Sequence, residues 1–107
     1  MDLNSVAFQI ISSSGDGFSD AMQALELIRE QDFENAQKLL NNSEQKIIEA
    51  HKVQSDLLFH FANGEDIISN VLLGHAQDHL AKSEVILIMA NEIMTMKKEL
   101  IKIMETK

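Results

Sequence analysis

Two histidines, an aspartate and a glutamine stand close together in the segment Leu72-Leu73-Gly74-His75-Ala76-Gln77-Asp78-His79-Leu80. If this segment is helical, residues three and four positions apart share a face, so His75 lies beside both Asp78 and His79. A neutral imidazole is a nucleophile near pH 7 and is also a common metal ligand. The spacing therefore makes His75 a candidate nucleophile with Asp78 and His79 as its neighbours.

Two other functions fit the same residues. Histidines at positions i and i+4 are the geometry by which helical HExxH motifs bind zinc, so His75, Asp78 and His79 are candidate metal ligands if a further ligand comes from His51 or His60. Alternatively, the chain is a helical interaction module whose methionines, leucines and isoleucines form a core and a partner groove. A lone histidine on an apolar face is more often a core residue than a catalyst, but two of them flanking an aspartate favour a site.

Both histidines fall within a repeat of seven residues that is otherwise apolar. One position of the repeat holds Leu72, His79, Ile86, Ile93 and Leu100, and the second holds Ile68, His75, Met89, Met96 and Ile103. This pattern predicts that the histidines lie on the buried side of their helix. Asp78 falls on an adjoining stripe, in which the small residues Gly74 and Ala81 would let another helix come close.

Three long helices are predicted to position these residues. The first runs from about Leu3 to Gln31, and its poor helix formers at positions 12–17 indicate a kink, a close helix contact or a late helix start. Asp32 is predicted to be the N-cap of a second helix that lasts to about Asn63. Gly64 would end that helix, and Glu65-Asp66 or Ser69 would cap a third that continues through Met104.

Helices of about 30 residues are on the order of 45 Å long, so short connections force them into an antiparallel up-down-up array. The predicted fold is therefore all-α, an antiparallel three-helix bundle. Hydrophobic residues cover most of the circumference of the third helix. A helix this long with apolar residues on more than one side needs a second partner, so self-association is also predicted.

Length and composition limit the remaining possibilities. At 107 residues the chain is expected to be a single domain, residues 1–107, and with no cysteine it has no disulfide and no thiolate metal site. Its formal charge of −8 is the wrong sign for binding phosphate backbones, which argues against nucleic acid. No apolar run reaches the roughly 18 residues of a membrane span and no export signal is evident, so a cytoplasmic protein without direct membrane insertion is expected.

Further blocks accompany the histidine segment in a fixed order: Phe8-Gln9-Ile10-Ile11, Asp32-Phe33-Glu34-Asn35-Ala36 and Ala50-His51-Lys52-Val53-Gln54. With these blocks the sequence resembles, over nearly its whole length, the lactose/cellobiose-type IIA subunits of the bacterial sugar phosphotransferase system. The block from Gly74 to Leu80 is the most specific in order and spacing. One departure is Ala81, where the family usually has methionine.

The resemblance implies that His75 accepts a phosphoryl group from the carrier protein HPr and passes it to a cysteine of the cognate IIB subunit, which serves the membrane component IIC. It also implies a nine-helix homotrimer in which Asp78 of each subunit meets its two symmetry mates around one magnesium ion (Mg²⁺). His79 and Gln77 match neighbours of the active site in that family. Lys82, on the next turn, is the nearest cation in the sequence. The membrane component recognises the sugar, so this subunit does not specify it.

Overall fold

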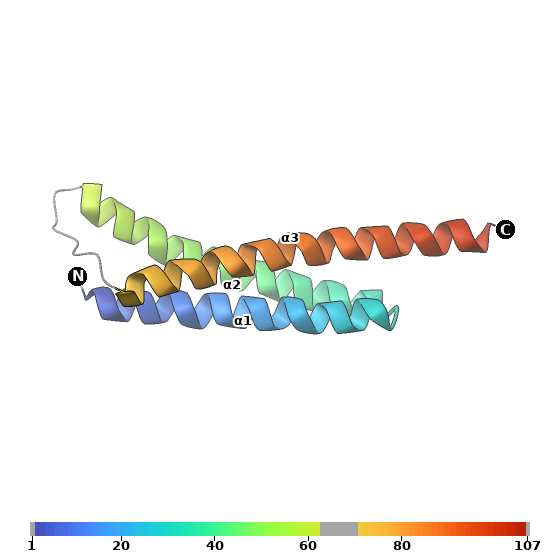
Figure 1. The fold of residues 1–107 in the computed structure, drawn as a ribbon, viewed down its shortest axis with the longest axis horizontal. Helices are drawn as coiled ribbons and strands as arrows, with labels where there is room; N and C mark the ends of the chain where they lie inside the picture. The colour runs from blue at the N-terminus through green and yellow to red at the C-terminus, as the bar shows by residue number, and fades with distance from the viewer. Residues whose placement is uncertain (1, 63–70, 107) are drawn as a thin grey trace.

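Three α-helices form the fold: α1 (Leu3–Arg29), α2 (Phe33–Ala62) and α3 (Val71–Glu105). The structure, a computed structural model, describes residues 2–62 and 71–106. The helices run up, down and up along one long axis, and α3 extends well past the turn between α1 and α2 (Figure 1). The molecule measures 63 × 20 × 19 Å along its principal axes. The predicted antiparallel arrangement of three helices is confirmed.

The turn between α1 and α2 is short because a residue that ends α1 is followed directly by the N-cap of α2. Gln31 has a positive φ of 63°, a left-handed conformation that ends the helix at Arg29, two residues before the predicted end. Asp32 then caps α2, since its Oδ1 accepts a hydrogen bond from the backbone N–H of Asn35 at 3.3 Å. The N-cap prediction for Asp32 is confirmed. The predicted helix boundaries at residues 63–69 lie outside the described residues.

Two apolar clusters make up the core, one toward each end of the bundle. The first contains Ala7, Ile10, Ile47, Ala50, Leu57, Leu73, Ala76 and Leu80. The second contains Ala24, Ile28, Ala36, Leu40, Ala90 and Met94. In both clusters α1 is central, because it packs along both α2 and α3 whereas those two helices touch each other much less.

Three fully buried serines, one from each helix, lie along the bundle between the two clusters. The Ser83 hydroxyl donates to the backbone oxygen of Ser14 at 2.6 Å, and the Ser43 hydroxyl donates to that of Gly17 at 2.7 Å. Ser14 itself donates to the oxygen of Ile10 at 2.5 Å. Because every hydroxyl has an acceptor, this polar layer is buried at little cost and fixes the register of the helices. The stretch at positions 12–17 is thus a close helix contact within an unbroken helix.

Gly17 and Gly15 make a matched pair for testing this contact. A Cβ on Gly17 would lie 3.2 Å from the backbone oxygen of Ser43 and 3.1 Å from Cγ1 of Ile47, whereas a Cβ on Gly15 meets nothing within 4 Å. We therefore expect Gly17→Ala to lower the free energy of unfolding by about 1–3 kcal/mol, because α2 must move away. Gly15→Ala should raise it by about 0.5–1 kcal/mol through helix propensity alone. Urea unfolding of both variants checks this, and equal effects would contradict the close contact.

The buried face of α3 differs from the predicted one. The residues of α3 that are buried are Leu73, Ala76, Leu80, Ser83, Ala90 and Met94. The predicted seam lies beside this face, so its members within residues 71–106 are half-buried or exposed; Ile68 is outside the described residues. The prediction was wrong because the buried face of α3 combines small residues with Leu73, Leu80 and Met94. This choice of face leaves many of the other large aliphatic side chains on the surface of the protomer. Among these exposed side chains are Val71, Val85, Ile88, Met89, Ile93, Met96, Leu100 and Ile103.

Candidate functional site

A pocket of about 170 Å³ on α3 is lined by His75, Asp78, His79 and Lys82. These residues are spaced i, i+3, i+4 and i+7, so one face of a single helix places them together. The structure thus brings His75, Asp78 and His79 together as expected from their spacing. It does not bury them, because His75 and Asp78 are exposed in the protomer and His79 is only half-buried. The pocket is consequently open to a partner protein.

The two imidazoles are in direct contact. Nε2 of His79 lies 3.1 Å from Nε2 of His75, and the rings are nearly perpendicular, with centroids 4.5 Å apart. A neutral imidazole has one N–H donor and one acceptor nitrogen, so this contact requires one ring to donate and the other to accept. Two protonated rings have no acceptor between them. The contact therefore requires that at least one of the two rings is neutral.

The pKa of His79 is lowered, which fits a neutral His79 ring in this contact. Burial is the main cause that lowers its pKa from the ordinary value of 6.5, and the charges of Lys82 and His75 lower it further. Asp78 acts in the opposite direction but does not outweigh them. His79 is consequently neutral at pH 7 and retains one N–H for hydrogen bonding.

We expect an NMR titration of His79 to give a midpoint below 6.5, and Lys82→Met to move that midpoint upward by removing a nearby positive charge. Lys98→Met is the control, since Lys98 lies over the ring of Phe33 instead. Between the folded and unfolded pKa values of His79, the unfolded chain binds more protons than the folded chain. This group therefore leaves stability unchanged above pH 6.5 and lowers it as the pH falls from 6.5 to the folded pKa. A midpoint at or above 6.5 would refute the assignment.

Contacts from the other helices hold this part of α3 in place. The Ser83 hydroxyl contacts the backbone oxygen of His79 at 2.8 Å as well as that of Ser14, which ties the site to α1. His51 of α2 forms an ion pair with Glu84 of α3. Sequence reasoning missed Ser83 and Glu84 in this role. The available signal was a small polar residue, Ser83, one turn after His79 on the face of α3 that packs against α1.

The other predicted site residues lie elsewhere. Gln77 is exposed and does not line the pocket. His51, considered as a further metal ligand, is engaged with Glu84. Across residues 2–62 and 71–106, no three histidine, aspartate or glutamate side chains are placed to hold a metal ion together. The alternative of a metal site formed by His75, Asp78 and His79 within one protomer therefore has no support.

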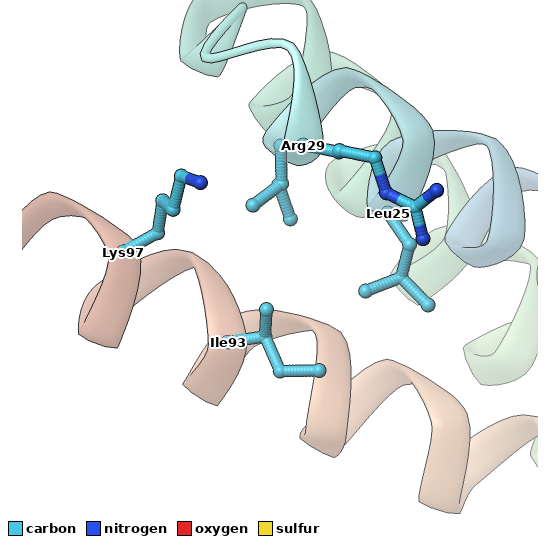
Figure 2. Close-up of a pocket in the computed structure, with 5 residues that line it drawn as sticks. Leu25, Arg29, Ile93 and Lys97 are labelled. Atoms are coloured by element: carbon cyan, nitrogen blue, oxygen red, sulfur yellow. The ribbon is translucent and has the colours of Figure 1, made fainter.

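A second pocket, of about 360 Å³, lies between α1 and α3. Figure 2 shows Leu25 and Arg29 of α1 facing Ile93 and Lys97 of α3 across it. Its lining is aliphatic with two cationic side chains, completed by Ile28, and contains no group that titrates near neutral pH. Of these two pockets, only the one at His75 has the side chains for nucleophilic or acid–base chemistry.

In the described part of the chain, no helix is long and apolar enough to cross a membrane.

Residues 5–98 match the family model described as PTS system, lactose/cellobiose specific IIA subunit. The chain therefore belongs to the lactose/cellobiose-specific IIA subunit family of the sugar phosphotransferase system.

Individual relatives agree with this assignment. The chain is 36 % identical to the lichenan-specific phosphotransferase enzyme IIA component of Bacillus subtilis (strain 168), over 87 % of this chain and 84 % of that protein. It is 35 % identical to the galactose-specific EIIA component of Lactococcus lactis subsp. cremoris (strain MG1363), over 92 % and 85 % respectively.

Two solved structures share the fold. The cellobiose-specific enzyme IIA from Bacillus anthracis superposes with a TM-score of 0.89 at 33 % identity, covering 94 % of this chain and 92 % of that one. The solution structure of the IIA(Chitobiose)–HPr complex of the Escherichia coli N,N'-diacetylchitobiose branch gives 0.76 at 27 % identity, covering 94 % and 97 %. The three-helix fold of this chain is thus shared with these solved IIA structures.

Proposed function

We propose that this chain is a phosphoryl carrier in which His75 accepts a phosphoryl group from HPr and passes it to the cognate IIB subunit. The observation that carries the proposal is an exposed His75 imidazole paired with a second imidazole in an open pocket. A neighbouring fold solved in complex with HPr supports the choice of donor. IIB would in turn serve the membrane component IIC, which makes the cytoplasm the expected place of action.

The transfer needs one nucleophilic lone pair at His75. We assign the attack to Nε2, the nitrogen that faces His79. A bond forms between Nε2 and phosphorus while the bond from phosphorus to the donor breaks, and its electron pair stays with the donor. Before this bond forms, the N–H of His79 must leave Nε2 of His75, and it turns to a phosphoryl oxygen. Since phosphoryl transfer depends mainly on positioning and charge stabilisation, this second imidazole has a positioning role.

Gln77 was predicted to be a neighbour of the active site, and it lies outside the pocket at His75. Its amide is exposed and lies outside the pocket, about 200° around the helix from His75. We therefore propose that Gln77 meets the surface of HPr or IIB rather than the phosphoryl group. Curated relatives of similar identity are named for lichenan, lactose, galactose and cellobiose. That variety fits a subunit that handles the phosphoryl group and leaves recognition of the sugar to another component.

We further propose that the protomers assemble into a nine-helix homotrimer with α3 innermost. Support comes from a stripe of α3 that is exposed in the protomer throughout: Val71, Gly74, Asp78, Ala81 and Val85. An exposed apolar face of this extent is typical of an interaction surface, and the small residues in it allow close approach. A three-fold axis along this stripe would bring three Asp78 carboxylates together. Carboxylate oxygens are ligands that Mg²⁺ prefers, so one ion shared by the trimer would neutralise them.

The test of the carrier function is labelling. The protein is incubated with radiolabelled phosphoenolpyruvate and the general components of the phosphotransferase system, and one phosphoryl group per chain is expected, on His75. Omitting HPr should remove the label. A pure interaction module would stay unlabelled with all components present, and that result would overturn the proposal.

A further inference from the structure

Lys82 is the positively charged residue that lines the pocket at His75. It lines the pocket with His75 and His79, seven and three positions after them on α3. The Lys82 side chain also lines a neighbouring hollow with Phe18, Val85 and Ile86, so it lies between the two. This places a positive charge on the side of the pocket away from the start of α3.

The charge of Lys82 is not neutralised by a carboxylate. Asp78 stands four positions before it, the spacing at which an aspartate and a lysine commonly pair on a helix. Within the described residues, however, no carboxylate comes within 4.0 Å of Nζ of Lys82. The carboxylate of Glu84, two positions further on, is engaged with His51. Lys82 therefore keeps its full charge at an open pocket.

Phe18 of α1 holds the ammonium group in the neighbouring hollow, beside the pocket at His75. Nζ of Lys82 lies 4.4 Å from the centroid of the Phe18 ring. A cation–π contact at an exposed site is weak and does not remove the charge. Such a contact is strong enough to orient the side chain and weak enough to be exchanged for an anion.

We infer that Lys82 binds the oxygens of a phosphoryl group on His75, and that its ammonium rests over Phe18 when His75 is unmodified. The inference rests on the proposed function and assigns the charge partner of the transferred group. Negative charge spreads over the non-bridging phosphoryl oxygens during transfer, and a fixed cation beside them stabilises it. A lysine serves as a point charge without the bidentate grip of an arginine, which suits a carrier that must release its cargo.

The experiment compares Lys82→Met, Lys82→Gln and Lys82→Arg with Lys98→Met, whose lysine lies over Phe33 instead. The full-length protein is equilibrated with mixtures of HPr and phospho-HPr, and the phosphorylated fraction and the transfer rate are measured. Losing one charge-assisted contact should lower the equilibrium constant for phosphorylation by roughly 10- to 100-fold in Lys82→Met and Lys82→Gln. Lys82→Arg should restore most of it, and Lys98→Met should match the wild type.

Two further readouts separate charge stabilisation from a structural effect. Raising ionic strength should reduce phosphorylation of the wild type more than that of Lys82→Met, because the interaction with Lys82 is screened. Phe18→Leu removes the resting contact but keeps the lysine, so its phosphorylation should be retained. An equilibrium constant unchanged in both neutral variants would overturn the inference, as would a change confined to KM for phospho-HPr. A wild type that takes no label would instead refute the proposed function.

Discussion

Replacing His75 by alanine will abolish phosphoryl acceptance and leave the three helices folded. The imidazole supplies the lone pair that bonds to phosphorus, and removing a nucleophile should lower transfer on the order of 10³-fold or more. Stability should change little, within about 0.5 kcal/mol, because His75 is exposed in the protomer. Labelling from phosphoenolpyruvate together with circular dichroism measures both expectations.

Three other histidine variants accompany this experiment. His51→Ala and His60→Ala are the controls and should keep the label, because neither residue lines the pocket at His75. His79→Ala should still be labelled, but about 10²-fold more slowly, since it loses one hydrogen-bond donor to the phosphoryl oxygens. Label retained on the His75→Ala protein, or found on His51 or His60, would show that another residue is the acceptor.

Most of the fold could be predicted because helix starts and stops are coded locally. Asp32 caps α2 through a hydrogen bond to a residue three positions away, and such a contact needs no information from the rest of the chain. The left-handed Gln31 was missed, since a glutamine rarely adopts that conformation. The poor helix formers at positions 12–17 indicated a kink, a close helix contact or a late helix start. Only the position of Ser43 against Gly17 identifies the close contact.

The buried face of α3 could not be predicted from the repeat of seven. Apolar side chains cover more than one side of this helix, so hydrophobicity alone does not say which side meets α1. The side that does carries small residues, Ala76, Ser83 and Ala90, which let the helices approach closely. A pattern search weights large aliphatic residues instead, and in the protomer many of these are exposed.

The candidate site likewise has a part that the sequence predicts and a part that depends on tertiary packing. His75, Asp78 and His79 come together through the spacing of one helix, so their proximity was predictable from the sequence alone. What surrounds them depends on tertiary packing: the ring of Phe18 under Lys82 comes from α1, distant in the chain. The exposure of the histidines in the protomer likewise depends on which side of α3 faces α1.

Asp78→Leu is expected to raise the melting temperature of the proposed trimer and to make it insensitive to chelators. Three like charges brought together on a three-fold axis repel one another and lose hydration. Replacing a buried ionic cluster with apolar side chains of similar volume is often stabilising, by roughly 1–4 kcal/mol. The exposed neighbours of Asp78 on the stripe, Val71 and Val85, show that aliphatic side chains already occupy this side of α3.

The wild type should behave in the opposite way toward metal. An ion bound only by the assembled trimer stabilises it by mass action, so adding Mg²⁺ should raise the melting temperature and EDTA should lower it. Asp56→Leu is the control, because Asp56 is an exposed aspartate of α2 away from the stripe. It should retain the full response to Mg²⁺ and EDTA.

Light scattering and melting curves, each with and without EDTA, test whether Asp78 lies on a three-fold axis. The wild type and Asp78→Leu should each scatter as three chains of 12.0 kDa at micromolar concentration. In EDTA, an Asp78→Leu protein that melts earlier than the wild type, or that dissociates to protomers, would mean that the carboxylate stabilises the assembly without metal. A wild type that scatters as one chain would place the exposed face of α3 in contact with a different partner. In either case Asp78 would not lie on a three-fold axis, since there its charge destabilises the metal-free trimer and an apolar side chain relieves that repulsion.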